Sequence, residues 1–337
     1  AASATTSYCA IALDADMALE PTWMHGVLAL LAARAGADTL TSLPLQSFNM
    51  EAQHEMAFRT LQSGLNTGKI VVSIAEHVAT CAGVQVVTGG TGGLGLLTGR
   101  WLAQRGARSV FLASRSGALS QDASVEWEVM KASLAHLTVE RCDTTEVGHV
   151  ARLVAVAESP SGVWHSAGVL ADAVLPKQSA TGLAQAFAPK ASGAWSLHAT
   201  SAATSMDAFT LFSSVAALLG GAGQANYAAA NAGLDALAAC RRTCGAAAAS
   251  TQWGAWAEVG MAARGAASER MAAMEAASGF ARIGLAQGLG ALGMAIRKSS
   301  PSVLSLVPVA WNRFLGAQVP AFLSAFASRA VTTAHAV

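Results

Sequence analysis

A glycine-rich turn between an apolar run and an apolar helical segment constrains the fold of this chain more than any other feature. Residues 84–87 have the composition of a buried strand, and residues 96–103 have the pattern of a helix. Between them the chain reads Thr88-Gly89-Gly90-Thr91-Gly92-Gly93-Leu94-Gly95. Glycines let the backbone turn tightly and approach a pyrophosphate, and a helix N-terminus directs free N–H groups at it. The motif therefore predicts a phosphate site, and its alternative is a tight turn without a ligand.

Strands and helices alternate regularly from residue 84 onward. Apolar runs predict strands at 84–88, 109–113, 137–141, 162–165, 208–213, 249–253 and 303–307. Helices are predicted between them at 94–105, 122–135, 145–157, 181–199 and 225–240. Strands separated by helices of this length form parallel βαβ units. We therefore expect an α/β fold with a doubly wound parallel sheet and helices on both faces, with residues 260–279 as a helix or lid beside the site.

The first 80 residues do not join this alternation. They predict a helix at 23–34, a strand at 39–44, a helix at 50–62 and a strand at 69–74. No glycine-rich nucleotide turn lies among them. We therefore expect a small N-terminal α/β fragment over residues 1–80 and a dinucleotide-type domain over residues 81–337.

Composition and charge exclude several classes of protein. Apolar residues make up 53% of the 337 residues and charged residues 12%, so the chain has ample material for a core. The net charge of +1 gives no electrostatic basis for binding nucleic acid or a membrane surface. The uncharged span 208–234 is too rich in polar residues and glycine for a membrane helix. With no secretory signal and five cysteines without metal-ligand spacing, we expect reduced thiols and a cytoplasmic location, organelle targeting being left open.

Polar residues follow the next strands where a dinucleotide would extend. Arg115 lies between Ser114 and Ser116, where an acidic residue would accept the ribose 2′-hydroxyl of NAD; a guanidinium favours the 2′-phosphate of NADP(H). Cys142 and Asp143 follow the third strand, where a carboxylate would accept a hydrogen bond from the adenine amino group. A solvated arginine and a capping aspartate are the alternatives. Small residues after the fourth strand would let the cofactor lie against the backbone, in the run His165-Ser166-Ala167-Gly168.

Three polar residues make a constellation for carbonyl reduction. The chain has two tyrosines and five lysines; Tyr227 begins a predicted helix, Ser214 lies 13 residues earlier, and Lys190 lies 24 residues before Ser214. Carbonyl reduction needs a donor to the carbonyl oxygen, a proton donor, and a positive charge that eases loss of the phenol's proton. Ser214, Tyr227 and Lys190 would supply these in that order. Asn231, one helical turn after Tyr227, would orient Lys190 or hold a proton-relay water. Taken singly, these residues could be a strand-end serine, a buried tyrosine and a surface lysine without a catalytic role. Their joint spacing makes that alternative less favoured.

With these motifs, residues 84 to about 325 resemble the catalytic half of a ketoreductase domain from a polyketide synthase, close to that of animal-type fatty acid synthase, within the short-chain dehydrogenase/reductase superfamily. The superfamily's lysine usually lies four residues after the tyrosine, where this chain has Asn231. Polyketide ketoreductases take it instead from an upstream Pro-Lys-x-x-Gly stretch, which Pro189 to Gly193 matches. The similarity extends to Phe212-Ser213-Ser214, Gln252-Trp253-Gly254, Gly260-Met261 and Val307-Pro308.

The resemblance implies a Rossmann fold, NADPH as cofactor, and reduction of a 3-oxoacyl thioester to the 3-hydroxyacyl thioester. It implies that an acyl carrier protein presents the substrate on a phosphopantetheine arm, over which Met261 and the following segment would close. The residues 57–62 and 68–72 are similar to the end of a medium-chain-type enoyl reductase domain, although that family usually has histidine where Asn66 stands. Neighbouring synthase domains are therefore expected, namely an enoyl reductase and the ketoreductase's structural subdomain, with no enoyl reduction by this chain. A stand-alone reductase of small ketones and a non-catalytic pseudo-ketoreductase are the alternatives.

The same resemblance bears on stereochemistry. B-type members carry Leu-x-Asp after the fourth strand, as in Leu170 and Asp172, whereas A-type members usually carry tryptophan at the position of Leu219. Both features imply a B-type enzyme and a D-configured 3-hydroxyl, unless Asp172 only caps a turn. Three further residues are assigned to the substrate side of the site: Gln224, Trp253 and Met261.

Overall fold

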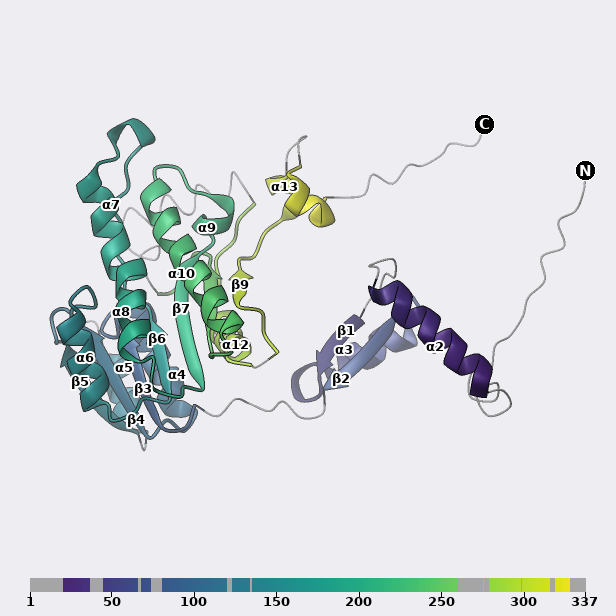
Figure 1. Cartoon of the computed structure of the whole chain (residues 1–337), viewed down its shortest axis with the longest axis horizontal. Helices are drawn as coiled ribbons and strands as arrows, with labels where there is room; N and C mark the ends of the chain where they lie inside the picture. Colours follow the sequence, from purple (N-terminus) through teal and green to yellow (C-terminus); the bar gives the residue numbers. More distant parts are fainter. Residues whose placement is uncertain are drawn as a thin grey trace, which may run out of the picture. The chain divides into compact units, whose positions relative to one another are not determined.

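A seven-stranded parallel sheet is the framework of the larger of two structural units (Figure 1). The units are Ala1–His77 and Val78–Val337. The computed structural model describes residues 21–36, 45–65, 68–73, 81–119, 123–133, 135–259, 275, 279–297, 299–315 and 319–327. The predicted α/β fold with a doubly wound sheet is confirmed in the larger unit.

The strands of this sheet lie close to their predicted positions. In chain order they are β3 (Val84–Thr88), β4 (Ser109–Ser114), β5 (His136–Arg141), β6 (Gly162–His165), β7 (Ala208–Ser214), β8 (Ala249–Trp253) and β9 (Val303–Leu306). Their order across the sheet is β5-β4-β3-β6-β7-β8-β9. The chain runs outward from β3 to β5 and then crosses to β6 on the other side of β3. The carboxyl ends of β3 and β6, where Thr88 pairs with His165, are therefore the switch point at which such sheets bind ligands.

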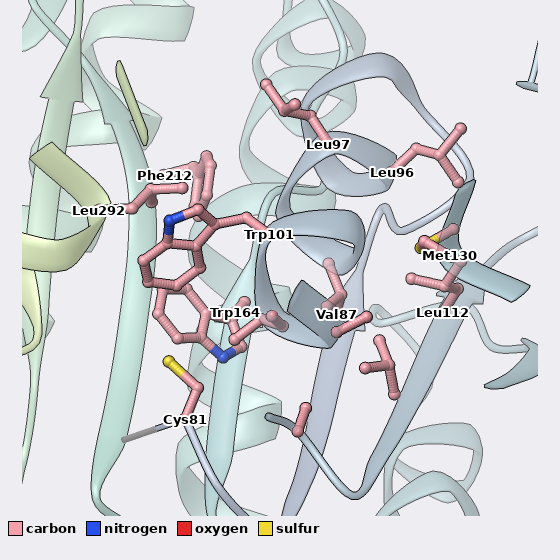
Figure 2. Packing of buried hydrophobic residues seen from close by; sticks show 14 of the residues in the cluster. Cys81, Val87, Leu96, Leu97, Trp101, Leu112, Met130, Trp164, Phe212 and Leu292 are labelled. Atoms are coloured by element: carbon pink, nitrogen blue, oxygen red, sulfur yellow. The ribbon is translucent and has the colours of Figure 1, made fainter. Parts of the chain in front are cut away.

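Helices cover both faces of the sheet because alternate side chains of each strand point to opposite faces. The helices of this unit are α4 (Gly93–Gln104), α5 (Ser124–Lys131), α6 (Val147–Val156), α7 (Ala180–Phe187), α8 (Gly193–Thr200), α9 (Ala216–Leu219), α10 (Ala225–Thr243), α12 (Leu285–Ala295) and α13 (Trp311–Phe314). Val87 and Trp164 belong to one buried cluster, with side chains from α4, α5 and α12 (Figure 2). Val86 and Val163 belong to a second cluster, with side chains from α6, α8 and α10. The sheet is thus buried on both faces, as parallel sheets require.

The helix predicted over 181–199 is divided in two. Between α7 and α8 the chain forms a π-helical turn over Ala188–Ser192. Pro189 has no backbone N–H and cannot complete the regular helical hydrogen-bond ladder, which explains the break. Lys190 therefore lies in the π turn and not on a regular helix. The helix predicted over 122–135 is also shorter in the structure, where it is α5.

The sequence prediction missed α12. Three of its eleven residues are glycine, which lowers intrinsic helix propensity. At Gly288 a Cβ atom would lie 1.9 Å from the Trp256 ring. Close packing against Trp256 therefore requires glycine here and stabilises a helix that its own sequence disfavours.

The smaller unit contains a two-stranded parallel sheet. Its elements are α2 (Pro21–Gly36), β1 (Leu45–Asn49), α3 (Met50–Gln62) and β2 (Lys69–Ser73), and β1 pairs with β2. The predicted helix at 50–62 is confirmed. The strand predicted at 39–44, Asn66, Met261 and nearly all of the predicted lid at 260–279 lie outside the described residues.

The uncharged span 208–234 forms β7, α9 and the first half of α10, as a strand, a loop region and a helix. In the described parts of the chain, no helix has both the length and the hydropathy that a membrane crossing requires.

Candidate active site

The glycine-rich turn holds the start of α4 against the ends of β3 and β6. Gly89 adopts φ +69°, and a Cβ atom there would lie 2.7 Å from the backbone nitrogen of Ala167. A Cβ atom at Gly95 would lie 2.2 Å from the carbonyl oxygen of Gly89. The N-cap residue Gly92 supplies no side chain to the first N–H groups of α4. The first N–H groups of α4 therefore have no side-chain cap, which is the arrangement that binds anions at helix N-termini.

A cavity of about 860 Å³ opens beside this turn, within the size range of cofactor sites. Most of the predicted cofactor residues line it: Gly89, Thr91, Gly92, Gly93, Leu94, Gly95, Ser114, Arg115, Ser116, Cys142, Asp143, Ser166, Ala167 and Gly168. Thr144, Val169 and Pro189 line it too, and sequence reasoning missed them as cofactor residues. Thr88, Gly90 and His165, also predicted to bind the cofactor, are buried and are not among the lining residues.

Arg115 is exposed at this cavity, directly after β4. The two serines beside it organise the turn: the hydroxyls of Ser114 and Ser116 lie 3.2 Å apart, and Ser114 accepts the backbone N–H of Gly117 at 3.2 Å. The guanidinium can therefore approach an anion from solvent while the turn that carries it stays fixed.

Asp143 is kept ionised at the other side of the cavity. Burial acts to raise the pKa of this carboxyl, and hydrogen bonds from the backbone and hydroxyl of Thr145 act to lower it. The charge of Arg115 acts in the same direction, and these effects together hold the pKa below its ordinary value. Burial raises the pKa of the neighbouring Cys142 thiol to about 11, so that Cys142 lines the cavity as a neutral group.

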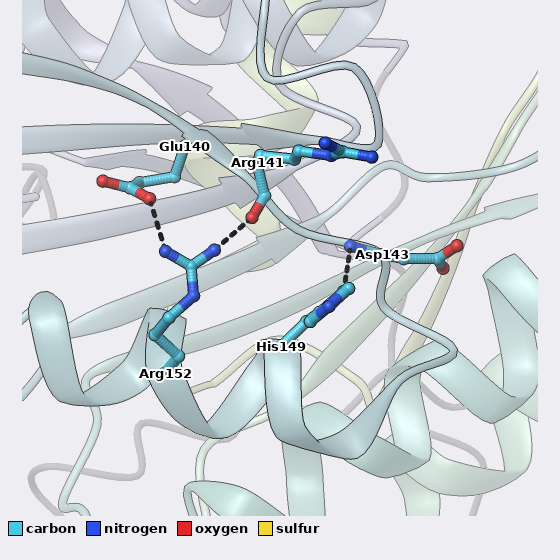
Figure 3. Close-up of polar contacts among 5 residues, drawn as sticks. All are labelled: Glu140, Arg141, Asp143, His149 and Arg152. Atoms are coloured by element: carbon cyan, nitrogen blue, oxygen red, sulfur yellow. Dashed lines mark hydrogen bonds and ion pairs between the residues drawn. The ribbon is translucent and has the colours of Figure 1, made fainter.

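Helix α6 anchors the end of β5 that carries Asp143 (Figure 3). Arg152 donates to the carboxylate of Glu140 at 3.3 Å and to the carbonyl oxygen of Arg141. The ring nitrogen Nδ1 of His149 accepts the backbone N–H of Asp143 at 3.4 Å. Sequence reasoning assigned no role to Arg152 or His149, because neither lies in the motif that they support.

Lys190 is buried, with 3% of its surface exposed, and is held at several points. Its ammonium donates to the carbonyl oxygen of Phe212 on β7 at 2.8 Å and lies 5.2 Å from the centroid of the Tyr227 ring. A Cβ atom at Gly168 would lie 2.8 Å from Cε of Lys190, so the lysine stem packs directly against the cavity wall. Burial lowers the pKa of Lys190 to about 7, and the negative charge of Asp235 opposes this shift.

Tyr227, Asn231 and Ser214 lie together beside Lys190. Burial raises the pKa of Tyr227, while hydrogen bonding with the side chains of Asn231 and Ser214 acts to lower it. Asn231 donates to the backbone carbonyl of Tyr227 at 2.8 Å, and its buried Oδ1 has no protein hydrogen-bond partner in the described structure. The hydroxyl oxygen of Ser214 accepts the N–H of Ala216 at 3.2 Å, so its proton points to another acceptor, on the side of Tyr227. The structure therefore brings all four predicted catalytic residues into one cluster.

A loop that carries the predicted stereocontrol residues is tied to the start of α10. Asn226 donates to the carbonyl oxygens of Ala171 and Gly182 at 2.8 and 3.1 Å. Gln224 donates to the carboxylate of Asp172 at 3.3 Å. Sequence reasoning gave Asn226 no role, although it lies next to Tyr227; its bridges depend on long-range contacts that the motif does not specify.

The other predicted substrate residues lie in different environments. Leu170 is exposed, and half-buried Leu219 lines a separate apolar groove with residues from the C-terminal part of the chain. Trp253 is 4% exposed and packs between Phe212 and Trp256, with ring centroids 5.7 and 5.1 Å away. Its contacts are those of a core residue that supports the end of β8.

Comparison with known proteins places this site in context. Residues 83–258 match a family model described as KR domain. The chain is 37% identical over 275 residues to a phenolphthiocerol/phthiocerol polyketide synthase of Mycobacterium tuberculosis, covering 77% of this chain and 12% of that protein. It is 40% identical over 238 residues to polyketide synthase GfsB of Streptomyces halstedii, covering 70% of this chain and 4% of that protein. The chain thus spans only a small part of these relatives.

Solved structures of ketoreductase domains also match this chain. An A-type ketoreductase from a modular polyketide synthase matches 72% of this chain and 51% of its own, with a TM-score of 0.67 and 35% identity. The glycine turn, the residues that line the cavity and the cluster of predicted catalytic residues all lie within the matched residues 83–258.

Proposed function

Because the chain belongs to the KR domain family, whose members are ketoreductases of polyketide synthases, we propose that it reduces the ketone of a 3-oxoacyl thioester to the 3-hydroxyacyl thioester with NADPH as reductant. The observation that carries this proposal is the cluster of Ser214, Tyr227 and Lys190 beside the cavity. Lys190 connects this cluster to the cavity, because its stem packs against Gly168 in the cavity wall.

The residues of the cavity fit a phosphorylated dinucleotide. The turn at 89–95 packs so closely on itself that a Cβ atom at Gly95 would lie 2.2 Å from the carbonyl oxygen of Gly89, and the N-terminus of α4 offers N–H groups without a side-chain cap to a pyrophosphate. Arg115 and its serines would hold a 2′-phosphate, and Asp143 would accept the adenine amino group. When bound, NADPH supplies the hydride for the ketone carbon.

The chain's own residues bind and protonate the ketone oxygen of the substrate. Ser214 donates its hydroxyl proton to the ketone oxygen when the substrate is bound. As the ketone oxygen becomes an alkoxide, Tyr227 transfers its phenol proton to that oxygen. The ammonium of Lys190 stabilises the phenolate that remains on Tyr227. The buried Oδ1 of Asn231 has no protein partner in the described structure, so it holds a water that returns a proton to Lys190 and Tyr227.

The context of the reaction is a multidomain synthase. An acyl carrier protein delivers the acyl chain on its phosphopantetheine arm, and residues 1–80 belong to the end of an enoyl reductase domain. Leu170, Asp172 and Leu219 favour B-type reduction with a D-configured 3-hydroxyl. The bridge from Gln224 to Asp172 supports this assignment by fixing Asp172 beside the helix of Tyr227.

Nicotinamide absorbance tests the proposal directly. The full chain is mixed with a 3-oxoacyl N-acetylcysteamine thioester and, in parallel, with NADPH or NADH. We expect oxidation of NADPH, little oxidation of NADH, and a D-configured product by chiral chromatography. Reduction of simple ketones alone would favour a stand-alone reductase, and NADPH binding without any oxidation would favour a non-catalytic domain.

Arg115→Ala should weaken NADPH binding by about tenfold and leave NADH binding nearly unchanged, because an exposed charge-assisted pair to a phosphate contributes modestly. Fluorescence titration of both cofactors measures the two Kd values. Arg59→Ala is the matched control: it removes the same charge from an exposed site on α3 and should alter neither Kd. Equal weakening of NADPH and NADH by Arg115→Ala would overturn the 2′-phosphate assignment.

A further inference from the structure

His165 links the switch point of the sheet to the turn that carries Lys190. Thr88 and His165 are fully buried and face each other across the β3–β6 pair, with Thr88 Oγ1 2.7 Å from Nδ1 of the ring. On the other side of the ring, Nε2 lies 2.9 Å from the backbone carbonyl oxygen of Lys190. A single imidazole therefore bridges the residue that begins the glycine turn and the residue that supplies the catalytic charge.

The two hydrogen bonds define the state of the ring. A carbonyl oxygen only accepts, so Nε2 carries the proton and donates it to Lys190. In the neutral ring Nδ1 is then an acceptor, and the Thr88 hydroxyl donates to it. Burial lowers the pKa of His165 to about 4, so the ring keeps this neutral form near neutral pH.

The surroundings confine the ring and the lysine together. A Cβ atom at Gly193 would lie 2.6 Å from Thr144 Oγ1 and 3.2 Å from Cε1 of His165, so only glycine lets α8 start this close to the ring. Toward the tip of the side chain, the Lys190 stem packs against Gly168 and its ammonium donates to the backbone carbonyl of Phe212. The lysine is thus fixed at its backbone and at its tip.

We propose that His165 is a positioning residue for Lys190: its Nε2–H holds the carbonyl of the π-helical turn and thereby sets where the ammonium lies relative to Tyr227. This inference rests on the proposed function, because the position of Lys190 affects turnover only if the lysine supports proton transfer from Tyr227. It assigns His165 to the proton-transfer machinery and not to direct contact with the cofactor, in agreement with its place behind the cavity wall.

Two amide substitutions separate the two hydrogen bonds. In His165→Gln, the amide nitrogen stands as many bonds from Cβ as Nε2 does, so it still reaches the Lys190 carbonyl. In His165→Asn, the side chain ends at the position of Nδ1, so it keeps Thr88 but not Lys190. We expect His165→Gln to retain kcat within about threefold and His165→Asn to lose about 30-fold, with both KM values nearly unchanged.

A neighbouring residue provides the stability control. Trp164 precedes His165 on β6, points to the opposite face, and donates its indole N–H to Gln85 on β3 at 2.9 Å. Trp164→Phe removes a buried hydrogen bond between the same two strands, so it should lower the melting temperature without a selective loss of kcat. A kcat loss in His165→Asn no larger than that in Trp164→Phe at equal stability would overturn the proposal.

Labelling of Lys190 gives a readout that needs no turnover. Acetylation by a water-soluble reagent, followed by peptide mass spectrometry, should find Lys190 protected and exposed Lys177 reactive in the unmodified chain and in His165→Gln. In His165→Asn we expect Lys190 to react about tenfold faster, with Lys177 unchanged. Equal protection of Lys190 in both variants would contradict the positioning role of His165, whether or not the chain reduces a thioester. A chain that reduced no thioester would refute the proposed function separately.

Discussion

Tyr227→Phe is expected to lower kcat for 3-oxoacyl thioester reduction by about 1,000-fold and to leave the Kd for NADPH unchanged. The substitution removes only the hydroxyl group, the proposed proton donor. The ring is 8% exposed and packs with Lys190 Nζ 5.2 Å from its centroid, a contact that phenylalanine retains. Because burial raises the pKa of Tyr227, the phenol holds its proton near neutral pH and is available as an acid.

Single-turnover kinetics with saturating NADPH measure the loss, and fluorescence titration measures cofactor binding. Tyr8→Phe makes the same chemical change at the other tyrosine of the chain and should leave kcat unaltered. If Tyr227→Phe lost cofactor binding and activity together, the tyrosine would be structural and the proposed role wrong.

The glycine-rich part of the candidate site could be predicted because its residues are neighbours in the sequence. A strand, a turn of glycines and a helix follow one another, and the same stretch forms one wall of the cavity. The same holds for Arg115 and Asp143, which lie one residue after β4 and two residues after β5. Parallel strands bring their carboxyl ends to one edge, so residues that follow successive strands meet there without any further information.

The surroundings of Lys190 could not be predicted in this way. Whether the side chains of Thr88 and His165 face the cavity or the core depends on the register of two short strands. In a strand of four residues, such as β6, the alternation of apolar and polar side chains is too short to predict which face each one takes. The π turn depends on how Pro189 is accommodated between two helices, which the helical pattern of 181–199 conceals. Asn226 and His165 act through backbone carbonyls far away in sequence, and such bonds leave no motif.

Lys190→Met should lower kcat by about 100-fold or more and should also change how stability depends on pH. Methionine preserves the unbranched stem that packs against Gly168, while the charge beside Tyr227 is lost. In the unmodified chain, reduction should decline as pH rises through about 7, because the neutral amine no longer stabilises the phenolate. The variant should lack that decline, and steady-state kinetics across this range measure both effects.

The stability of the same variant tests the buried charge independently of turnover. Burial lowers the pKa of Lys190 from the ordinary 10.5 to about 7, so between these values the unfolded chain binds a proton that the folded chain has released. The free energy of unfolding therefore gains up to about 1.4 kcal/mol per pH unit from this lysine as pH rises, and below pH 7 its burial penalty is fully present. Urea unfolding at several pH values should show a shallower rise in Lys190→Met, while exposed Lys177→Met should follow the unmodified chain. Parallel curves for all three proteins would mean that Lys190 keeps its proton in the folded state, and the decline in reduction above neutral pH would then need another titrating group.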